Sequence, residues 1–243
     1  MDFLNSIILL TNFIIVPGIT YGSQLALGAI GVTLIYGVLR FANFAYGDLM
    51  AFGTMVVILM TWYLQSKGIS FGLLPTALLA LPIGILLTIA VSLFFDKTVF
   101  EYYRNKKSNP VTFIVVSLGI MFVLNAVVRI IIGPNDINFM DGHKFIMKAR
   151  EFKQLTGLNE GLAIKSTQVI TLVTTIITCS ILFYFLNKTK TGKSMRAYSN
   201  NEDLALLSGI DPKKIVLITW VIVSVLATVA GTLYGLDKSF KPF

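Results

Sequence analysis

Long, nearly uncharged apolar stretches constrain what this chain can fold into more than any motif does. A bilayer hydrocarbon core about 30 Å thick is crossed by roughly 20 apolar residues in a helix. Six stretches approach or exceed that length: 16–39, 49–64, 71–95, 111–132, 168–186 and 215–236. The second is short unless it begins near Phe44. The sequence therefore predicts an all-α, polytopic integral membrane protein with about six to seven transmembrane helices, forming one transmembrane domain over residues 1–243.

The composition agrees with this class, because 55% of the residues are hydrophobic and only 13% are charged. Arg129 is the one charge inside a predicted span, and it lies near enough to the end of that span to reach the interface. The N-terminal apolar segment has neither a basic n-region nor a small-residue cleavage site, so no removable signal peptide is expected. Pro17 and Gly18 predict a break between an interfacial or partly inserted segment and the first full span.

Lysine and arginine collect in two segments, 96–110 and 188–214, which the positive-inside rule places in the cytoplasm. Alternation of the spans then puts 40–48 inside as well. Three segments are expected outside: 66–70, 133–167 and the tail from 237. This topology, together with attraction to anionic lipid, accounts for the net charge of +8, so no nucleic acid partner is expected.

Between the last two spans the sequence predicts a short helix that faces the cytoplasm. The segment carries, in order, Asn200, Asn201, Glu202, Asp203, the apolar run 204–207 and Gly209. Asparagine accepts hydrogen bonds from the first free N–H groups, acids suit the positive end of the helix dipole, and glycine ends the helix. Asp211 and Pro212 fit the cap and the first position of the next span. A short amphipathic helix on a basic surface is best interpreted as a docking site for a cytoplasmic partner.

Three uncharged polar residues are candidates for a translocation path: Gln24, Asn43 and Asn125. Gln24 lies in a glycine-rich span, where close helix packing is the more common role, but a polar side chain in hydrocarbon also needs water or a partner. Asn43 begins a segment ending at Asp48, and a turn with a helix cap is favoured there over a gate. Asn125 is the amide in its span best suited to face a cavity, although an interhelical hydrogen bond would explain it equally well.

The residues provide no catalytic or metal-binding constellation. Cys179 is alone within a span, and the one histidine, His143, has no neighbouring ligand, so no metal site is expected. The stretch TGKS at 191–194 is similar to the end of a phosphate-binding loop, but Asn187 stands where that motif requires glycine. The chain is therefore expected to be no enzyme, to bind no nucleotide and to hold no cofactor.

Two separated blocks carry a resemblance to a known family. The stretch LIYGVLRFANFAYGD at 34–48 resembles the opening helix and N-F-A-H-G-D signature of LivH-type permeases, with Tyr46 in place of the usual histidine. The second block is similar to the cytoplasmic loop and following helix of bacterial ABC-importer permeases for branched-chain amino acids. Its residues are Gly192, Arg196, Ala197, Asn200, Glu202, Ala205, Gly209, Ile210, Ala227, Ala230 and Gly231.

The resemblance implies a multi-pass permease subunit of the bacterial inner membrane that imports branched-chain amino acids. It also implies a second homologous permease subunit, two ATP-binding cassette subunits that hold ATP and Mg²⁺ inside, and a substrate-binding protein outside. The segment 200–209 would be the coupling helix within loop 188–214. The residues expected to couple to the ATPase are Arg196, Ala197, Asn200, Glu202, Asp203, Ala205 and Gly209. Family members usually continue for further spans, so the resemblance suggests a shortened permease.

The sequence leaves alternatives open. A permease for urea, short amides or other amino acids would share both blocks. An ion-coupled secondary transporter would be expected to carry ionisable residues in its spans, and these are nearly absent here.

Overall fold

The computed structural model of the protein describes residues 2–72, 74–142, 144–156 and 160–241. The architecture is all-α and polytopic, as predicted, and among the described residues six helices are long and apolar enough to cross a membrane. The long helices are α2 (Val16–Leu39), α3 (Tyr46–Ser66), α4 (Ala77–Phe95), α6 (Pro110–Ile132), α8 (Ser166–Lys188) and α11 (Pro212–Lys238). The shorter elements are α1 (Asp2–Leu10), η1 (Thr11–Ile15), η2 (Asp96–Phe100), α5 (Glu101–Asn105), β1 (Phe145–Met147), α7 (Ala149–Thr156), β2 (Ile164–Lys165), α9 (Lys190–Asn200) and α10 (Glu202–Leu207).

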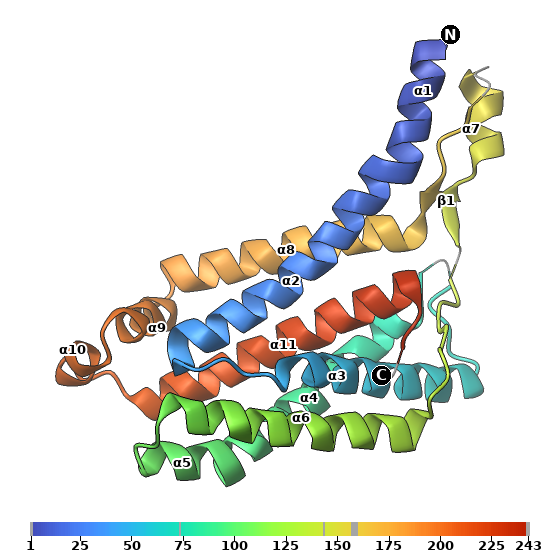
Figure 1. Ribbon diagram of the computed structural model, residues 1–243. Coiled ribbons are helices and arrows are strands. Elements are labelled where there is room, and N and C mark those ends of the chain that lie inside the picture. Colours follow the sequence, from blue (N-terminus) through green and yellow to red (C-terminus); the bar gives the residue numbers. More distant parts are fainter. Residues whose placement is uncertain (1, 73, 143, 157–159, 242–243) are drawn as a thin grey trace.

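The last span, α11, is the centre of the bundle, and α2, α3 and α4 pack around it (Figure 1). In its most apolar stretch 67% of the residues are buried, against 6% in α8, which lies at the edge of the bundle. Small residues allow the close contacts at the centre. A Cβ on Gly53 of α3 would lie 2.6 Å from Thr228 Oγ1 of α11, and a Cβ on Gly231 would lie 2.8 Å from the Met50 carbonyl oxygen.

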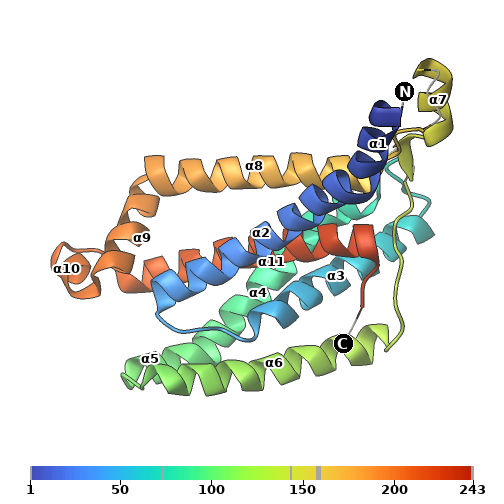
Figure 2. The same ribbon diagram turned by 45° about the horizontal axis from the view of Figure 1, so that its top comes forward.

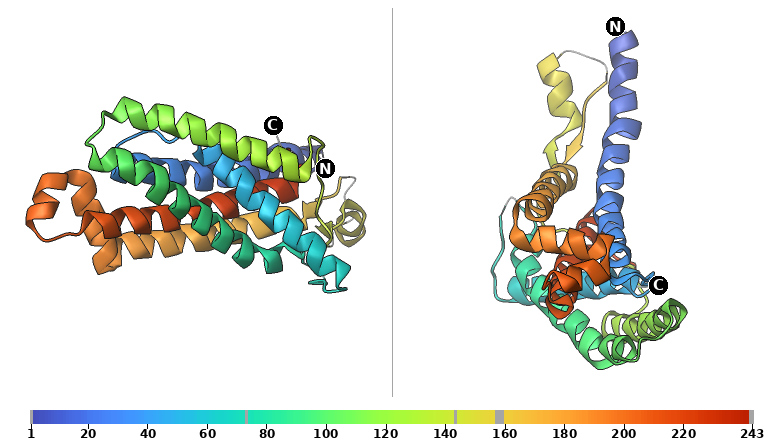
Figure 3. Two further views of the ribbon diagram at one scale, coloured as in Figure 1. Left: turned by 90° about the horizontal axis from the view of Figure 1, so that it is seen from below. Right: turned by 90° about the vertical axis from the view of Figure 1, so that its left-hand side faces the viewer.

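The two ends of the bundle differ in charge and in structure. The end that carries α5, α9 and α10 holds both of the lysine- and arginine-rich segments, and we refer to it as the basic end (Figure 3). The short antiparallel pair β1–β2 and α7 lie at the opposite end (Figure 2). Within segment 133–167 the described elements are α7 and the strand pair. His143 lies outside the described residues.

The predicted break at Pro17 and Gly18 is wrong. The chain is helical without interruption from Asp2 to Leu39, and α1 extends beyond the bundle (Figure 3). The π-helical turn η1 precedes the proline, and Val16 N donates to Thr11 O across it. Because this wider turn reorganises the backbone hydrogen bonds just before the proline, the missing amide hydrogen does not end the helix. Asn12 attaches this helix to segment 133–167, accepting from Ala163 N at 3.0 Å.

The third predicted span also begins later than expected, at Ala77 instead of residue 71. Pro75 and Thr76 belong to a turn at the opposite end, and Asp141 holds it in place. Asp141 Oδ1 accepts from Thr76 N at 2.8 Å, and Oδ2 accepts from Gln65 Nε2 at 2.8 Å. Burial alone would raise the pKa of Asp141, but the hydrogen bonds from Thr76 and Gln65 outweigh it and lower that pKa below its usual value.

Candidate functional site

The segment 40–48 enters the bundle, although it was predicted to be a cytoplasmic loop. Arg40, the left-handed C-cap of α2, lies at the basic end, and Figure 1 shows α3 beginning part-way along the bundle. Asn43, Ala45 and Tyr46 are all buried. The segment runs inward because the helices beside it satisfy its polar groups, as a non-helical stretch at membrane depth requires.

Two hydrogen bonds to α6 fix the depth of this segment. Phe44 N donates to Ser117 Oγ at 3.1 Å, and Asn125 Nδ2 donates to Asp48 Oδ1 at 2.9 Å. At about 1.5 Å per residue, Asn125 lies roughly 22 Å along α6 from its start. The first turn of α3 is therefore well inside the membrane-crossing layer. The expected turn is present, because Asn43 Oδ1 accepts from Ala45 N at 3.1 Å, but the N-cap is Ala45, which makes no side-chain cap.

A cavity of about 550 Å³ lies beside this segment, between α2, α3 and α11. It brings together two of the three predicted path residues, Gln24 and Asn43. The third, Asn125, is not among its lining residues and is instead bonded to Asp48. Its other lining residues are Leu25, Gly28, Ala29, Val32, Phe44, Tyr46, Gly47, Met50, Ala230 and Tyr234. The lining is mostly apolar and carries no formal charge.

Two buried polar atoms at this cavity have no hydrogen-bond partner among the described residues: Gln24 Oε1 and the Tyr46 hydroxyl. The Gln24 side chain is 3% exposed, and its Nε2 donates to Leu233 O at 3.4 Å. The Tyr46 hydroxyl occupies the space that a side chain at Gly31 would fill. Because an unpaired buried polar group costs about 1–3 kcal/mol, such groups are found where water or a ligand can pair with them.

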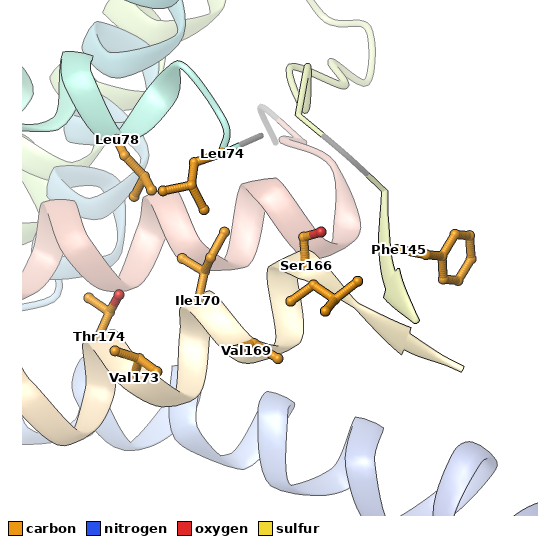
Figure 4. A pocket seen from close by; sticks show the side chains of 9 residues that line it. Leu74, Leu78, Phe145, Ser166, Val169, Ile170, Val173 and Thr174 are labelled. Atoms are coloured by element: carbon orange, nitrogen blue, oxygen red, sulfur yellow. The ribbon is translucent and has the colours of Figure 1, made fainter. Parts of the chain in front are cut away.

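A second cavity, of about 610 Å³, lies near the opposite end between α8 and the start of α4 (Figure 4). In Figure 4, Leu74 and Leu78 point toward Ile170 of α8. The lining is almost entirely apolar and includes none of the predicted site residues. It therefore offers little to orient a polar solute.

At the basic end, the predicted short helix is present as α10, and an unpredicted helix, α9, precedes it. Asn201 caps α10, accepting from Leu204 N at 3.0 Å, and Gly209 ends the turn with φ +78°. The prediction that Asn200 belongs to this helix is wrong, because Asn200 is the last residue of α9. Thr189 caps α9 by accepting from Gly192 N at 3.0 Å, and this threonine is the sequence signal that could have revealed the helix. Asp211 and Pro212 start α11 as predicted.

The helices α9 and α10 form a hairpin, and six of its seven predicted coupling residues are exposed: Arg196, Ala197, Asn200, Glu202, Asp203 and Gly209. The seventh, Ala205, is buried against Val38 of α2 and Ile215 of α11, and it anchors the hairpin to the bundle. Leu204 and Leu207 are 61% and 84% exposed. Large apolar side chains exposed beyond the spans are typical of a protein interface.

Hydrogen bonds connect this hairpin to the end of α2. The Tyr198 hydroxyl donates to Glu202 Oε1 at 2.7 Å and joins α9 to α10. Ser199 Oγ donates to Gly37 O at 2.7 Å, and the Arg40 guanidinium donates to Ser199 O. Burial, followed by the hydrogen bond and negative charge of Glu202, raises the pKa of Tyr198, so its hydroxyl stays protonated as a donor. The hairpin is thus attached to the same chain segment that continues into the cavity.

Residues 14–243 match the sequence profile of a family described as the permease component of the branched-chain amino acid transport system. The chain belongs to this family. The permease is 27% identical to the high-affinity branched-chain amino acid transport permease LivH of Escherichia coli over 222 residues, which cover 90% of the chain and 68% of LivH. It is 26% identical to BraD of Pseudomonas aeruginosa, over 92% of the chain and 70% of BraD. It is 28% identical to a probable LivH of Methanocaldococcus jannaschii, over 95% of the chain and 68% of that protein. No solved structure matches.

The match extends over both blocks that carried the resemblance in the sequence, so the expected family is confirmed. The permease is a multi-pass membrane protein and a transport component. The roles of the seven coupling residues and of the three path residues stay predictions.

Proposed function

We propose that this permease carries branched-chain amino acids across the bacterial inner membrane as one membrane subunit of an ABC importer. In this proposal the α9–α10 hairpin is the docking site for the ATP-binding cassette subunits, of which the importer has two, and these subunits hydrolyse the ATP. The chain itself binds no nucleotide or other cofactor. A second homologous permease subunit completes the membrane part, and a substrate-binding protein delivers the cargo at the opposite end. The observation that carries the proposal is the hydrogen-bonded connection from the exposed hairpin to the segment that borders the cavity.

The connection suggests how movement outside the membrane reaches the cavity. A displacement of α10 is transmitted to α9 through Tyr198 and Glu202, and from α9 to the end of α2 through Ser199 and Gly37. The segment 40–48 leaves α2 at that point and lines the cavity with Asn43 and Tyr46. A rigid-body shift of the hairpin can therefore change the shape of the cavity and expose it to alternate sides.

The cavity fits a small zwitterion with an apolar side chain. Its volume of about 550 Å³ lies within the roughly 300–1,000 Å³ that is typical of small-molecule sites. Leu25, Val32 and Met50 provide apolar surface, whereas Gln24 and Asn43 provide amides that can bind the charged groups of an amino acid. Because no lining residue carries a formal charge, binding would be weak enough for release.

Uptake by the complete importer tests the proposal. The permease is reconstituted in proteoliposomes with its partner subunits and binding protein, and ATP-dependent uptake of labelled leucine, isoleucine and valine is compared with that of urea and acetamide. We expect uptake of the three amino acids alone. Equal uptake of urea, or uptake without ATP, would contradict the proposed cargo or energy source.

The docking role is tested in the same system. Gly209→Pro, or Glu202→Lys combined with Asp203→Lys, should abolish coupled uptake and substrate-stimulated ATP hydrolysis while leaving membrane insertion intact. Lys193→Gln provides the control, since it changes one exposed charge elsewhere on the hairpin. Normal transport by the first two variants would refute docking at α10.

A further inference from the structure

A third cavity, of about 260 Å³, lies at the basic end where the end of α2, α5, the start of α6 and the α9–α10 hairpin meet. Its polar lining includes three cations, Arg40, Arg104 and Lys107, together with Tyr198 and Glu202. Tyr198 and Glu202 also belong to the proposed route from α10 to α2, but the cavity itself has no role in transport as proposed above. Arg104 and Lys107 lie on α5 and the turn after it, and the fold brings Arg40, at the end of α2, beside them.

The cavity has an excess of positive charge. Arg104 is paired with Asp96, at 3.1 Å and 3.3 Å between its two terminal nitrogens and the carboxylate oxygens. Glu202 accepts a hydrogen bond from Tyr198. The Arg40 guanidinium donates one hydrogen bond to Ser199 O, and its remaining N–H groups are available to a ligand. No ion pair involves Lys107 within the described ranges. The three cations therefore exceed the two acids, Asp96 and Glu202, by one positive charge.

The backbone gives a second, independent indication. Arg40 and Lys107 both adopt left-handed conformations, with φ +62° and +50°. Glycine is the residue that adopts this conformation without steric cost, and residues held there against preference concentrate at functional sites. Ser239 is the one other non-glycine residue with positive φ in the described part of the chain, and it lies at the opposite end. Two cationic side chains thus stand at this cavity at positions where glycine would adopt the backbone conformation more easily.

The apolar part of the lining indicates what kind of anion would occupy the cavity. It includes Val38 of α2, Phe113 of α6 and Val216 of α11, all of which belong to membrane-crossing helices. Val38 and Val216 are buried, and Phe113 is half-buried, so the cations lie beside an apolar lining formed by the ends of the membrane-crossing helices. A phospholipid can fill both parts, because its phosphate contacts the cations and its first acyl carbons contact the apolar side chains. Basic pockets between transmembrane helices bind anionic headgroups in this way.

We propose that the phosphate of an anionic glycerophospholipid from the leaflet at the basic end binds between Arg40, Arg104 and Lys107. The bound lipid joins the loop after α5 to the end of α2, and hence to the hairpin that Arg40 contacts through Ser199. A free phosphate ion offers the same charge but leaves the apolar surface uncovered.

Lipid binding by the full-length permease tests this proposal. Native mass spectrometry measures the binding of phosphatidylglycerol against phosphatidylcholine, and melting temperature is followed in nanodiscs of each lipid. Lys107→Gly removes the cation and suits the left-handed backbone, so the variant should fold at least as well as the parent in neutral lipid. We expect its affinity for phosphatidylglycerol to fall about fivefold, the loss expected for one cation near an anionic headgroup. Lys107→Arg should restore binding.

Lys193→Gln is the matched control, because it removes one exposed charge from the same end of the protein outside the cavity. An equal loss of binding in this control, or unchanged binding by Lys107→Gly, would overturn the site. Inorganic phosphate added to the permease in phosphatidylcholine nanodiscs distinguishes the source of the anion. If it raises the melting temperature as much as phosphatidylglycerol does, and does so only when Lys107 is present, the occupant is a free anion and the lipid proposal is wrong.

Discussion

Replacing Gly31 of α2 with alanine tests how closely the segment 40–48, which contains Tyr46, must approach that helix. A Cβ at Gly31 would lie 1.9 Å from the hydroxyl oxygen of Tyr46 and 2.4 Å from its Cζ. Tyr46 is 2% exposed, so its ring has little room to move. The added methyl group must therefore displace the ring, and with it the start of α3, or separate α3 from α2.

The expected magnitude follows from this geometry. Overpacking a close contact costs about 1–3 kcal/mol, and the higher helix propensity of alanine returns up to about 1 kcal/mol. We expect Gly31→Ala to lose about 1–2 kcal/mol of stability, which corresponds to a melting temperature lower by roughly 2–8 °C in a chain of this size. Gly28→Ala is the matched control on the same helix. Its Cβ would lie 3.5 Å from Met50 Cε, an ordinary contact, so stability should be unchanged or slightly higher.

A double-mutant cycle with Tyr46→Phe separates the steric conflict from other effects. The Tyr46 hydroxyl has no partner among the described residues, so its removal should be neutral or stabilising on its own. In the Gly31→Ala background it removes the closest of the clashing atoms and should recover part of the loss. Melting temperatures of the four proteins in detergent provide the readout. Equal stability of Gly31→Ala and Gly28→Ala, or no recovery by Tyr46→Phe, would refute the reasoning.

Two further predictions concern the hairpin and the opposite end. Ser199→Ala removes the hydrogen bond to Gly37 O, worth about 1 kcal/mol, and should lower coupled uptake by about fivefold while ATP hydrolysis continues. Ser194→Ala, whose hydroxyl donates within α9, is its control, and equal uptake by both variants would contradict the link. Because the pKa of Asp141 is lowered, its contribution is present above the ordinary carboxylate pKa of about 4 and is lost as pH falls through the folded value. Asp141→Asn should therefore be slightly less stable than the parent at pH 7, by less than about 1 kcal/mol because the group is exposed, and the difference should shrink as pH falls through the folded pKa; a difference that stays constant with pH would contradict this.

The transmembrane spans could be predicted from the sequence because apolar length is a local property. The central span illustrates this: Asp211 and Pro212 specify its start, and its apolar residues specify that it crosses the membrane. The short helix α10 could be predicted for the same reason, since its cap Asn201 and the terminating Gly209 lie in one short segment. Family membership followed from two such local blocks.

Other features could not be predicted from the sequence and were revealed by the structure. Proline at position 17 ordinarily ends a helix, and only the π-helical turn before it explains why α2 continues. The segment 40–48 reads as a polar loop, and its depth is set by Ser117 and Asn125 on α6, which supply its hydrogen bonds. The hydrogen bond from the Asn125 amide to Asp48 also keeps Asn125 apart from Gln24 and Asn43, the two predicted path residues that line the cavity.

The sequence by itself therefore determined that this protein crosses a membrane several times, which end is basic, and that a short capped helix precedes the last span. The tertiary structure alone decided where the polar residues lie relative to one another. It placed Gln24 and Asn43 at one cavity and Arg40 beside Lys107 at another. The physical reason is that lipid selects for apolar length along the chain, whereas a buried polar group is satisfied by whichever helix packs against it.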